Sequence, residues 1–189
     1  ETQERTPLLH VEHLTKEFPV EQGVFASRFN KKKVHAVNDV SFDIYPGETF
    51  GLVGESGCGK STTGRCIMRL TQPTSGRVVF DGKDVASMGR RELKEMRRNM
   101  QYIFQDPYAS LNPRMTVEQI VAEPITTNHI LPADQVGGRV DELLERVGIR
   151  PDLKRRYPHE FSGGQRQRVG IARALAVSPK LIVCDEPVS

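Results

Sequence analysis

Hydrophobic and polar positions alternate at both ends of the chain, and in its middle they take a helical spacing. For example, Val40, Phe42 and Ile44 alternate with polar neighbours, whereas Val140, Leu143, Leu144 and Val147 recur every three to four residues. The pattern predicts strands over 8–18, 36–44, 49–53, 77–80, 101–104 and 181–184. It predicts helices over 60–70, 90–99, 117–122, 136–147 and 162–176. Both ends therefore read as α/β and the middle as mostly helical.

Two of the predicted strands are short, mainly apolar runs. The runs 49–53 and 181–184 lack alternation, which is typical of strands buried on both faces of a sheet. Each run is followed by polar residues, a glycine-rich loop after the first and two acids after the second. The polar, glycine-containing segment 20–33 predicts a loop instead.

Composition excludes several classes of protein. The chain has 189 residues, of which 37% are hydrophobic and 27% charged, as in an ordinary globular domain. No apolar run approaches the roughly 18 residues of a membrane-spanning helix. The net charge is +3. The basic residues are scattered in short clusters and form no basic stripe that would suggest nucleic acid binding. The three cysteines form no C-x-x-C pair, and the polar N-terminus has no signal core, so we expect a cytosolic protein.

A phosphate-binding loop is predicted between the strand over 49–53 and the helix that follows. The segment Gly54–Ser61 fits the pattern G-x-x-x-x-G-K-[ST]. Its glycines let backbone N–H groups surround a phosphate at a helix N-terminus. Lys60 is placed to reach the β- and γ-phosphates, and Ser61 offers a hydroxyl to Mg²⁺. The predicted nucleotide-binding residues here are Gly54, Glu55, Ser56, Gly57, Cys58, Gly59, Lys60, Ser61 and Thr62.

Two carboxylates follow the last predicted strand. Asp185 and Glu186 come directly after Leu181–Cys184, at the strand end where α/β sheets place their ligands. Asp185 is predicted to hold Mg²⁺ through water, and Glu186 to act as general base toward an attacking water. Strands often end in an acid, so this pattern alone is weak evidence for a metal site. It becomes strong evidence together with the predicted phosphate loop.

A second anion-binding helix start is predicted at Ser162. This residue can cap the helix, and Gly163 and Gly164 expose backbone N–H groups before Gln165. One chain cannot easily place two such sites on the same phosphate. We therefore expect this segment to close over a nucleotide held by a second subunit.

Taken in order, Gly54–Ser61, Gln105, Ser162–Gln165 and 181–186 resemble the motifs of the ATP-binding cassette (ABC) ATPases, over nearly the whole chain. The resemblance implies a P-loop NTPase of α/β class with an antiparallel β subdomain and an inserted α-helical subdomain. It implies three segments: 1–104 with the β subdomain and ATPase core, 105–161 with the helical subdomain, and 162–189 with the signature helix and the strand before the acids.

The resemblance also assigns roles to single residues. Gln105 corresponds to the glutamine that touches Mg²⁺ and the attacking water and links to the membrane partner. Ser162–Gln165 corresponds to the signature that contacts the γ-phosphate across a dimer. Phe18 falls where the family stacks an aromatic ring on adenine, although Phe25, Phe29 and His35 compete for that place.

Segments 54–62, 104–114 and 157–168 resemble the dipeptide and oligopeptide importer ATPases. This implies an ATPase with ATP and Mg²⁺ that sits peripherally on the cytoplasmic face of the membrane. It would contact permease subunits through Gln105–Arg114 and pair with a related, non-identical ATPase subunit, without nucleic acid. A nickel or glutathione importer remains an alternative, as does a soluble cassette protein acting on nucleic acid or ribosomes. A P-loop kinase or GTPase is disfavoured by Ser162–Gln165 and by the lack of a guanine-reading N-K-x-D.

The chain stops three residues after Glu186, whereas the resembled family continues with an aspartate loop and a histidine that senses the γ-phosphate. We therefore expect a domain truncated at its C-terminus, which binds ATP but on its own hydrolyses it poorly.

Overall fold

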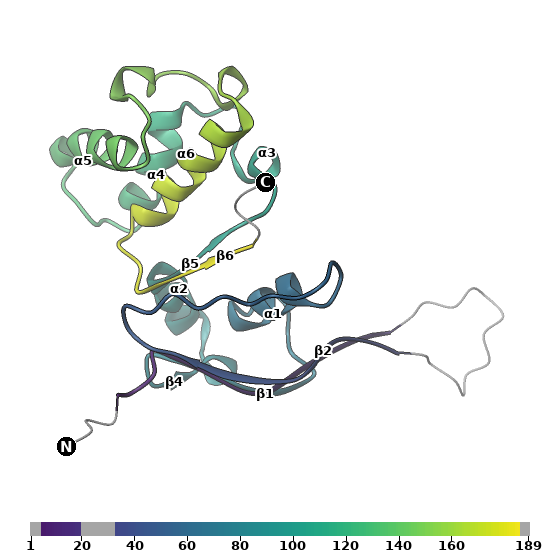
Figure 1. The fold of residues 1–189 in the computed structure, drawn as a ribbon. Helices are drawn as coiled ribbons and strands as arrows, with labels where there is room; N and C mark the ends of the chain where they lie inside the picture. Colours follow the sequence, from purple (N-terminus) through teal and green to yellow (C-terminus); the bar gives the residue numbers. More distant parts are fainter. Residues whose placement is uncertain (1–4, 20–32, 186–189) are drawn as a thin grey trace. The chain divides into compact units, whose positions relative to one another are not determined.

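The computed structural model of the chain describes residues 5–19 and 33–185 (Figure 1). The chain forms two compact units, Glu1–Met96 and Arg97–Ser189. Within the described ranges, no helix is both long and apolar enough to cross a membrane. Most of the predicted loop over 20–33 lies outside the described residues, as do Phe25, Phe29 and Glu186.

The N-terminal unit is built on an antiparallel sheet with the strand order β2-β1-β3-β4. Its strands are β1 (Leu9–Pro19), β2 (Lys33–Ile44), β3 (Ser75–Phe80) and β4 (Lys83–Asp84). On β1, Leu9, Val11 and Leu14 are fully buried, and helix α1 (Lys60–Ile67) contacts both β1 and β2. The short helix η1 (Val85–Ser87) and helix α2 (Arg90–Asn99) follow. The strands predicted over 8–18, 36–44 and 77–80 are confirmed.

The strand predicted over 49–53 is wrong for this structure. These residues have no strand assignment, and the described sheets consist of β1 to β4 and of β5 (Met100–Ile103) with β6 (Leu181–Cys184). Leu52 is 41% exposed and Val53 is 90% exposed, while Phe50 stacks on Phe42. A strand needs a neighbour for its backbone hydrogen bonds, and no described strand pairs with this segment.

The C-terminal unit combines the parallel pair β5–β6 with a helical core. Its helices are α3 (Pro107–Ser110), α4 (Val117–Thr127), α5 (Ala133–Arg146), η2 (Pro151–Leu153), η3 (Pro158–Glu160) and α6 (Gly163–Leu175). Helix α6 contacts α3, α4 and α5, which surround it in Figure 1. The core includes Val117, Ile120, Val121, Ile125, Val140, Leu143, Leu144, Phe161, Val169 and Ala172. The predicted helices are confirmed, and α4 runs five residues past the predicted end through Pro124.

The strand over 181–184 is present but less buried than its apolar run predicts. Leu181, Ile182 and Val183 are half-buried, and Cys184 is exposed. Within the described residues β6 pairs only with β5, so one edge of this strand has no neighbour to cover it.

Two half-buried cations connect the helices of this unit. Arg173 on α6 donates from Nη1 to the carbonyl oxygen of Ser110 at 2.7 Å. Burial lowers the pKa of the Arg173 guanidinium, and the charge of Glu123 opposes that shift. Lys154 lies 2.7 Å from Asp141 on α5 and 3.7 Å from Glu118 on α4, and its hydrogen bond with Asp141 raises its pKa. The helix that begins after Ser162 is therefore held in a defined orientation within its unit.

Candidate functional site

The predicted phosphate loop leads directly into α1. Helix α1 begins behind Gly59, which has φ 96° and no side-chain cap. A Cβ atom at this position would lie 1.8 Å from the carbonyl oxygen of Ala36, so only glycine fits. The Cys58 N–H donates to the Glu55 carbonyl at 3.2 Å, which closes the turn ahead of the helix.

Lys60 lies folded back over this loop. Its Nζ donates to the carbonyl oxygens of Gly54 at 2.8 Å and Glu55 at 2.9 Å. The ammonium is thus held against the loop, with its charge close to the N-terminus of α1. Gly54 through Cys58 are exposed within their unit, while Gly59 through Thr62 are half-buried. An anion bound here would meet a lysine charge, backbone N–H groups and the dipole of one helix.

The second predicted helix start is capped by its own side chains. The Gln165 N–H donates to the Ser162 hydroxyl at 3.3 Å, and the Ser162 N–H donates to the Gln165 side-chain oxygen at 3.0 Å. Phe161 just before it is buried in the helical core. Arg166 just after it is also buried, and its Nε donates to the Pro158 carbonyl at 2.7 Å.

Gly163 and Gly164 lie at the open side of this helix start. A Cβ atom built on either residue would meet no atom within 4 Å. The packing of this unit therefore does not require glycine at these positions. Two adjacent glycines that their own unit does not need are typical of a surface approached closely by another molecule.

The carboxyl ends of β5 and β6 bring Gln105 and Asp185 to one edge of the parallel pair. Ile103 and Cys184 are register partners, so Asp185 follows one paired end directly and Gln105 follows the other after Phe104. The Asp185 N–H donates to the Ile103 carbonyl at 3.0 Å and continues the ladder. The hydroxyl of Tyr102 donates to Oδ2 of Asp185 at 2.9 Å. Glu186, the predicted general base, lies outside the described residues.

Hydroxyl, amide and carboxylate oxygens are donors that Mg²⁺ accepts. Ser61, Gln105 and Asp185 provide one of each, so the predicted donor set fits this ion chemically. In the described ranges there is no group of three or more His, Cys, Asp or Glu residues that could hold a metal. A nucleotide-bound Mg²⁺ needs no such cage, because phosphate oxygens and waters complete its shell.

The predicted adenine-stacking residue Phe18 lies on β1 with its side chain 42% exposed. The Lys16 Nζ sits 4.9 Å from the centre of its ring. Of its competitors, His35 faces the carboxylate of Glu17 at 3.5 Å. An exposed ring with a neighbouring cation is compatible with stacking on a base, and the assignment of Phe18 stays a prediction.

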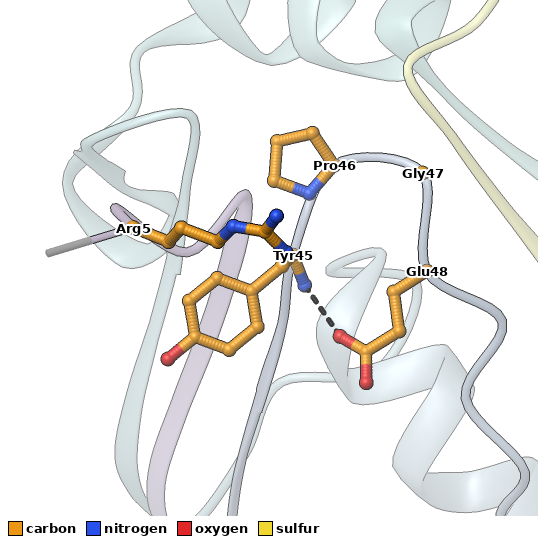
Figure 2. Close-up of a pocket in the computed structure, with 5 residues that line it drawn as sticks. All are labelled: Arg5, Tyr45, Pro46, Gly47 and Glu48. Carbon is orange, nitrogen blue, oxygen red and sulfur yellow. Dashed lines mark hydrogen bonds between the residues drawn. The ribbon is translucent and has the colours of Figure 1, made fainter. Parts of the chain in front are cut away.

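An open hollow lies elsewhere in the N-terminal unit, beside the turn that follows β2. Figure 2 shows its lining residues, which are Arg5, Tyr45, Pro46, Gly47 and Glu48. The Glu48 carboxylate accepts a hydrogen bond from the Tyr45 N–H at 2.8 Å and so stabilises the turn itself. None of the predicted nucleotide-binding residues lines this hollow.

The sequence reasoning missed Tyr102 and Arg173. Tyr102 reads as one position of a short apolar strand, and Arg173 as one of several cations on α6. Their partners, Asp185 and the Ser110 carbonyl, lie 83 and 63 residues away in the sequence. No local pattern could have indicated either contact.

The fold and these motifs define a nucleotide-binding ATPase domain of the ABC class. A family model described as ABC transporter matches residues 37–189. The chain belongs to the ABC transporter family, as the motifs in the sequence predicted.

Similar curated proteins and solved structures agree with this family assignment. The chain is 50% identical to the oligopeptide transport ATP-binding protein AppF of Bacillus subtilis (strain 168) over 96% of the chain and 55% of AppF. It is 54% identical to the probable peptide ABC transporter ATP-binding protein y4tS of Sinorhizobium fredii over 96% of the chain and 51% of that protein. It is 51% identical to the glutathione import ATP-binding protein GsiA of Escherichia coli (strain K12) over 97% of the chain and 29% of GsiA.

The chain thus spans about half the length of AppF and y4tS. Among solved structures it resembles the ATP-binding cassette MJ0796 in a dimeric post-hydrolysis state bound to ADP and Pi. The TM-score is 0.82 at 30% identity, over 95% of this chain and 74% of that one. The predicted ABC ATPase fold of α/β class is confirmed.

Proposed function

We propose that this chain is the ATP-binding and ATP-hydrolysing part of a subunit that energises a membrane importer of di- or oligopeptides. The proposal rests on the start of α1, where Gly59 turns the chain into the helix and the Lys60 ammonium lies against the preceding loop. The names of AppF and y4tS support peptides as the cargo.

In this proposal the residues divide the work as follows. Lys60 binds the β- and γ-phosphates, while Ser61, Gln105 and Asp185 hold Mg²⁺, Asp185 through water. The ion would neutralise charge on the phosphates during hydrolysis. Glu186 takes a proton from the attacking water. Phe18 stacks on adenine.

A second ATPase subunit completes the site. The start of α6 has a capping box between Ser162 and Gln165 and open space beside Gly163 and Gly164, which supports its use on a nucleotide held by a partner. The MJ0796 cassette that this chain resembles is dimeric. We propose that the partner is a related, non-identical chain and that the pair lies at the cytoplasmic face of the membrane without nucleic acid.

The loop assignment is tested by Lys60→Ala in calorimetric titration with ATP. Loss of the ammonium removes the charge that meets the phosphates, so we expect tight binding to disappear. Lys94→Ala, which removes an exposed lysine from α2, is the matched control and should bind as wild type. Unchanged ATP affinity in Lys60→Ala would refute the assigned loop.

Glu186→Gln tests the catalytic role in the intact protein. The variant keeps the size of the side chain but cannot take a proton, so it should bind ATP and barely hydrolyse it. Turnover at the wild-type rate would remove Glu186 from the base role.

The permease surface is proposed to be Gln105–Arg114. This segment has a defined shape, because Leu111 is buried, Arg173 holds the Ser110 carbonyl, and Asn112 accepts a hydrogen bond from the Arg114 N–H. Arg114→Glu should weaken co-purification with a permease and leave ATP affinity unchanged. Co-purification of ribosomes or DNA without any permease would favour the soluble cassette alternative.

Glutathione is the second candidate cargo, since GsiA is as similar to this chain as the peptide transport proteins are. Uptake of labelled dipeptide and of labelled glutathione by cells that express the intact importer separates the two. Uptake of glutathione alone would overturn the peptide assignment.

A further inference from the structure

We infer that Tyr102 is a positioning residue for Asp185. Its hydroxyl sets the orientation in which the Asp185 carboxylate faces the metal-bound water. The inference rests on the proposed function, in which Asp185 holds Mg²⁺ through water. Its basis is the hydrogen bond that the Tyr102 hydroxyl donates to Oδ2 of Asp185 at 2.9 Å.

The backbone fixes both residues at the same end of the parallel pair. Tyr102 is the register partner of Val183, two residues before Asp185. The N–H of Asp185 donates to the carbonyl of Ile103 at 3.0 Å, so the main chain at Asp185 is still part of the ladder. The position of the carboxylate therefore depends on its side-chain rotation, which the Tyr102 hydroxyl restrains.

The tyrosine ring is itself held in place. Tyr102 is 9% exposed, and its ring lies 4.6 Å from that of Phe104 at an angle of 48°. A packed aromatic ring has few accessible rotamers, so its hydroxyl presents a fixed donor. Tyr102 thus provides a rigid hydrogen-bond donor for the side chain of Asp185, which directly follows β6.

The hydrogen bond from Tyr102 to Asp185 is expected to affect metal binding. The Tyr102 hydroxyl restrains the rotation of the Asp185 carboxylate and so the direction in which this carboxylate faces a metal-bound water. Groups that hydrogen-bond to a ligating carboxylate orient it, and their loss typically weakens metal binding by about 10- to 100-fold. Because Asp185 acts through water, we expect the lower end of that range.

The test uses Tyr102→Phe in the intact protein, since this variant keeps the ring and its contact with Phe104. Binding of a fluorescent ATP analogue is measured in EDTA and then during titration with Mn²⁺. We expect an unchanged affinity in EDTA and a roughly tenfold rise in the Mn²⁺ concentration that gives half of the metal-dependent tightening. Tyr45→Phe, which removes a hydroxyl from the turn after β2, should leave both values unchanged.

A purely structural role predicts a different result. If Tyr102 only stabilises the fold, Tyr102→Phe lowers the affinity in EDTA and in Mn²⁺ by the same factor, or lowers the melting temperature without moving the Mn²⁺ midpoint. Either result overturns the inference, and so does an unchanged midpoint in a variant of unchanged stability.

Asp185→Ala separates this inference from the proposed function. If Asp185→Ala leaves the Mn²⁺ dependence intact, the metal role of Asp185 fails and the inference fails with it. If Asp185→Ala removes the dependence and Tyr102→Phe does not shift it, only the inference fails. In the Asp185→Ala background Tyr102→Phe should not change whatever response to Mn²⁺ remains, because Tyr102 acts through that carboxylate.

Discussion

The helices α1 and α6 both begin beside glycines in predicted phosphate-contacting segments, but their N-termini are built differently. Helix α1 starts behind Gly59 in a left-handed conformation, and no side chain caps it. Helix α6 starts at Ser162 with a reciprocal pair of hydrogen bonds between Ser162 and Gln165.

The difference indicates different tasks. At α1, the lysine charge lies against the loop carbonyls and the helix end has no side-chain cap, so a bound phosphate adds to what the chain itself provides. At α6, the Ser162 hydroxyl already accepts from the Gln165 N–H, and the neighbouring glycines have no side chain to keep another molecule away. We interpret α1 as the end that binds the nucleotide and α6 as the end that recognises a nucleotide bound elsewhere.

The largest effect is expected for Gly59→Ala. A side chain there meets the Ala36 carbonyl and forces a left-handed conformation on alanine, which together should cost about 3 kcal/mol. Chemical denaturation measures this loss. Gly57→Ala is the matched control, because Gly57 also has a positive φ but has nothing within 4 Å of the added Cβ. It should cost only about 1 kcal/mol, and equal losses in both variants would contradict the clash.

Arg173→Met tests the anchoring of α6. Removal of the guanidinium takes a charged donor away from the half-buried Ser110 carbonyl, so we expect a loss of about 2 kcal/mol. Arg173→Lys retains a cationic donor and should lose less. An unfolding midpoint equal to wild type in Arg173→Met would show that α6 is not anchored through this contact.

Ser162→Ala removes the cap of α6. The free energy of unfolding should fall by about 1 kcal/mol, since the Gln165 N–H loses its acceptor. Ser162→Thr keeps a hydroxyl at the same place and should retain most of the stability. If Ser162→Ala and Ser162→Thr are equally stable, the capping interaction contributes nothing and the contrast with α1 weakens.

The smallest change in stability is expected for Gly164→Ala, and its sign is opposite. Alanine fits the open space there and favours the helix, so the protein should gain about 0.5 kcal/mol. ATP turnover in the intact protein should nevertheless fall, because the added methyl group stands where a partner's nucleotide would approach. A variant that is both more stable and fully active would show that this surface meets no nucleotide.

Local chemistry explains which features could be predicted from the sequence. The start of α6 followed from Ser162 and Gln165, and the turn before α1 followed from its glycines. The strand prediction for residues 49–53 was wrong because an apolar run becomes a strand only when another strand pairs with it. The Tyr102–Asp185 contact could not be predicted either, because it depends on the register of β5 and β6, which brings together residues 83 positions apart.

The division of labour between α1 and α6 is tested most directly by calorimetric titration of ATP into Lys60→Ala and Gly164→Ala beside the wild-type protein. We expect Gly164→Ala to bind ATP with wild-type affinity and Lys60→Ala to lose tight binding. Loss of affinity in Gly164→Ala together with normal binding in Lys60→Ala would contradict the assignment of both helix ends.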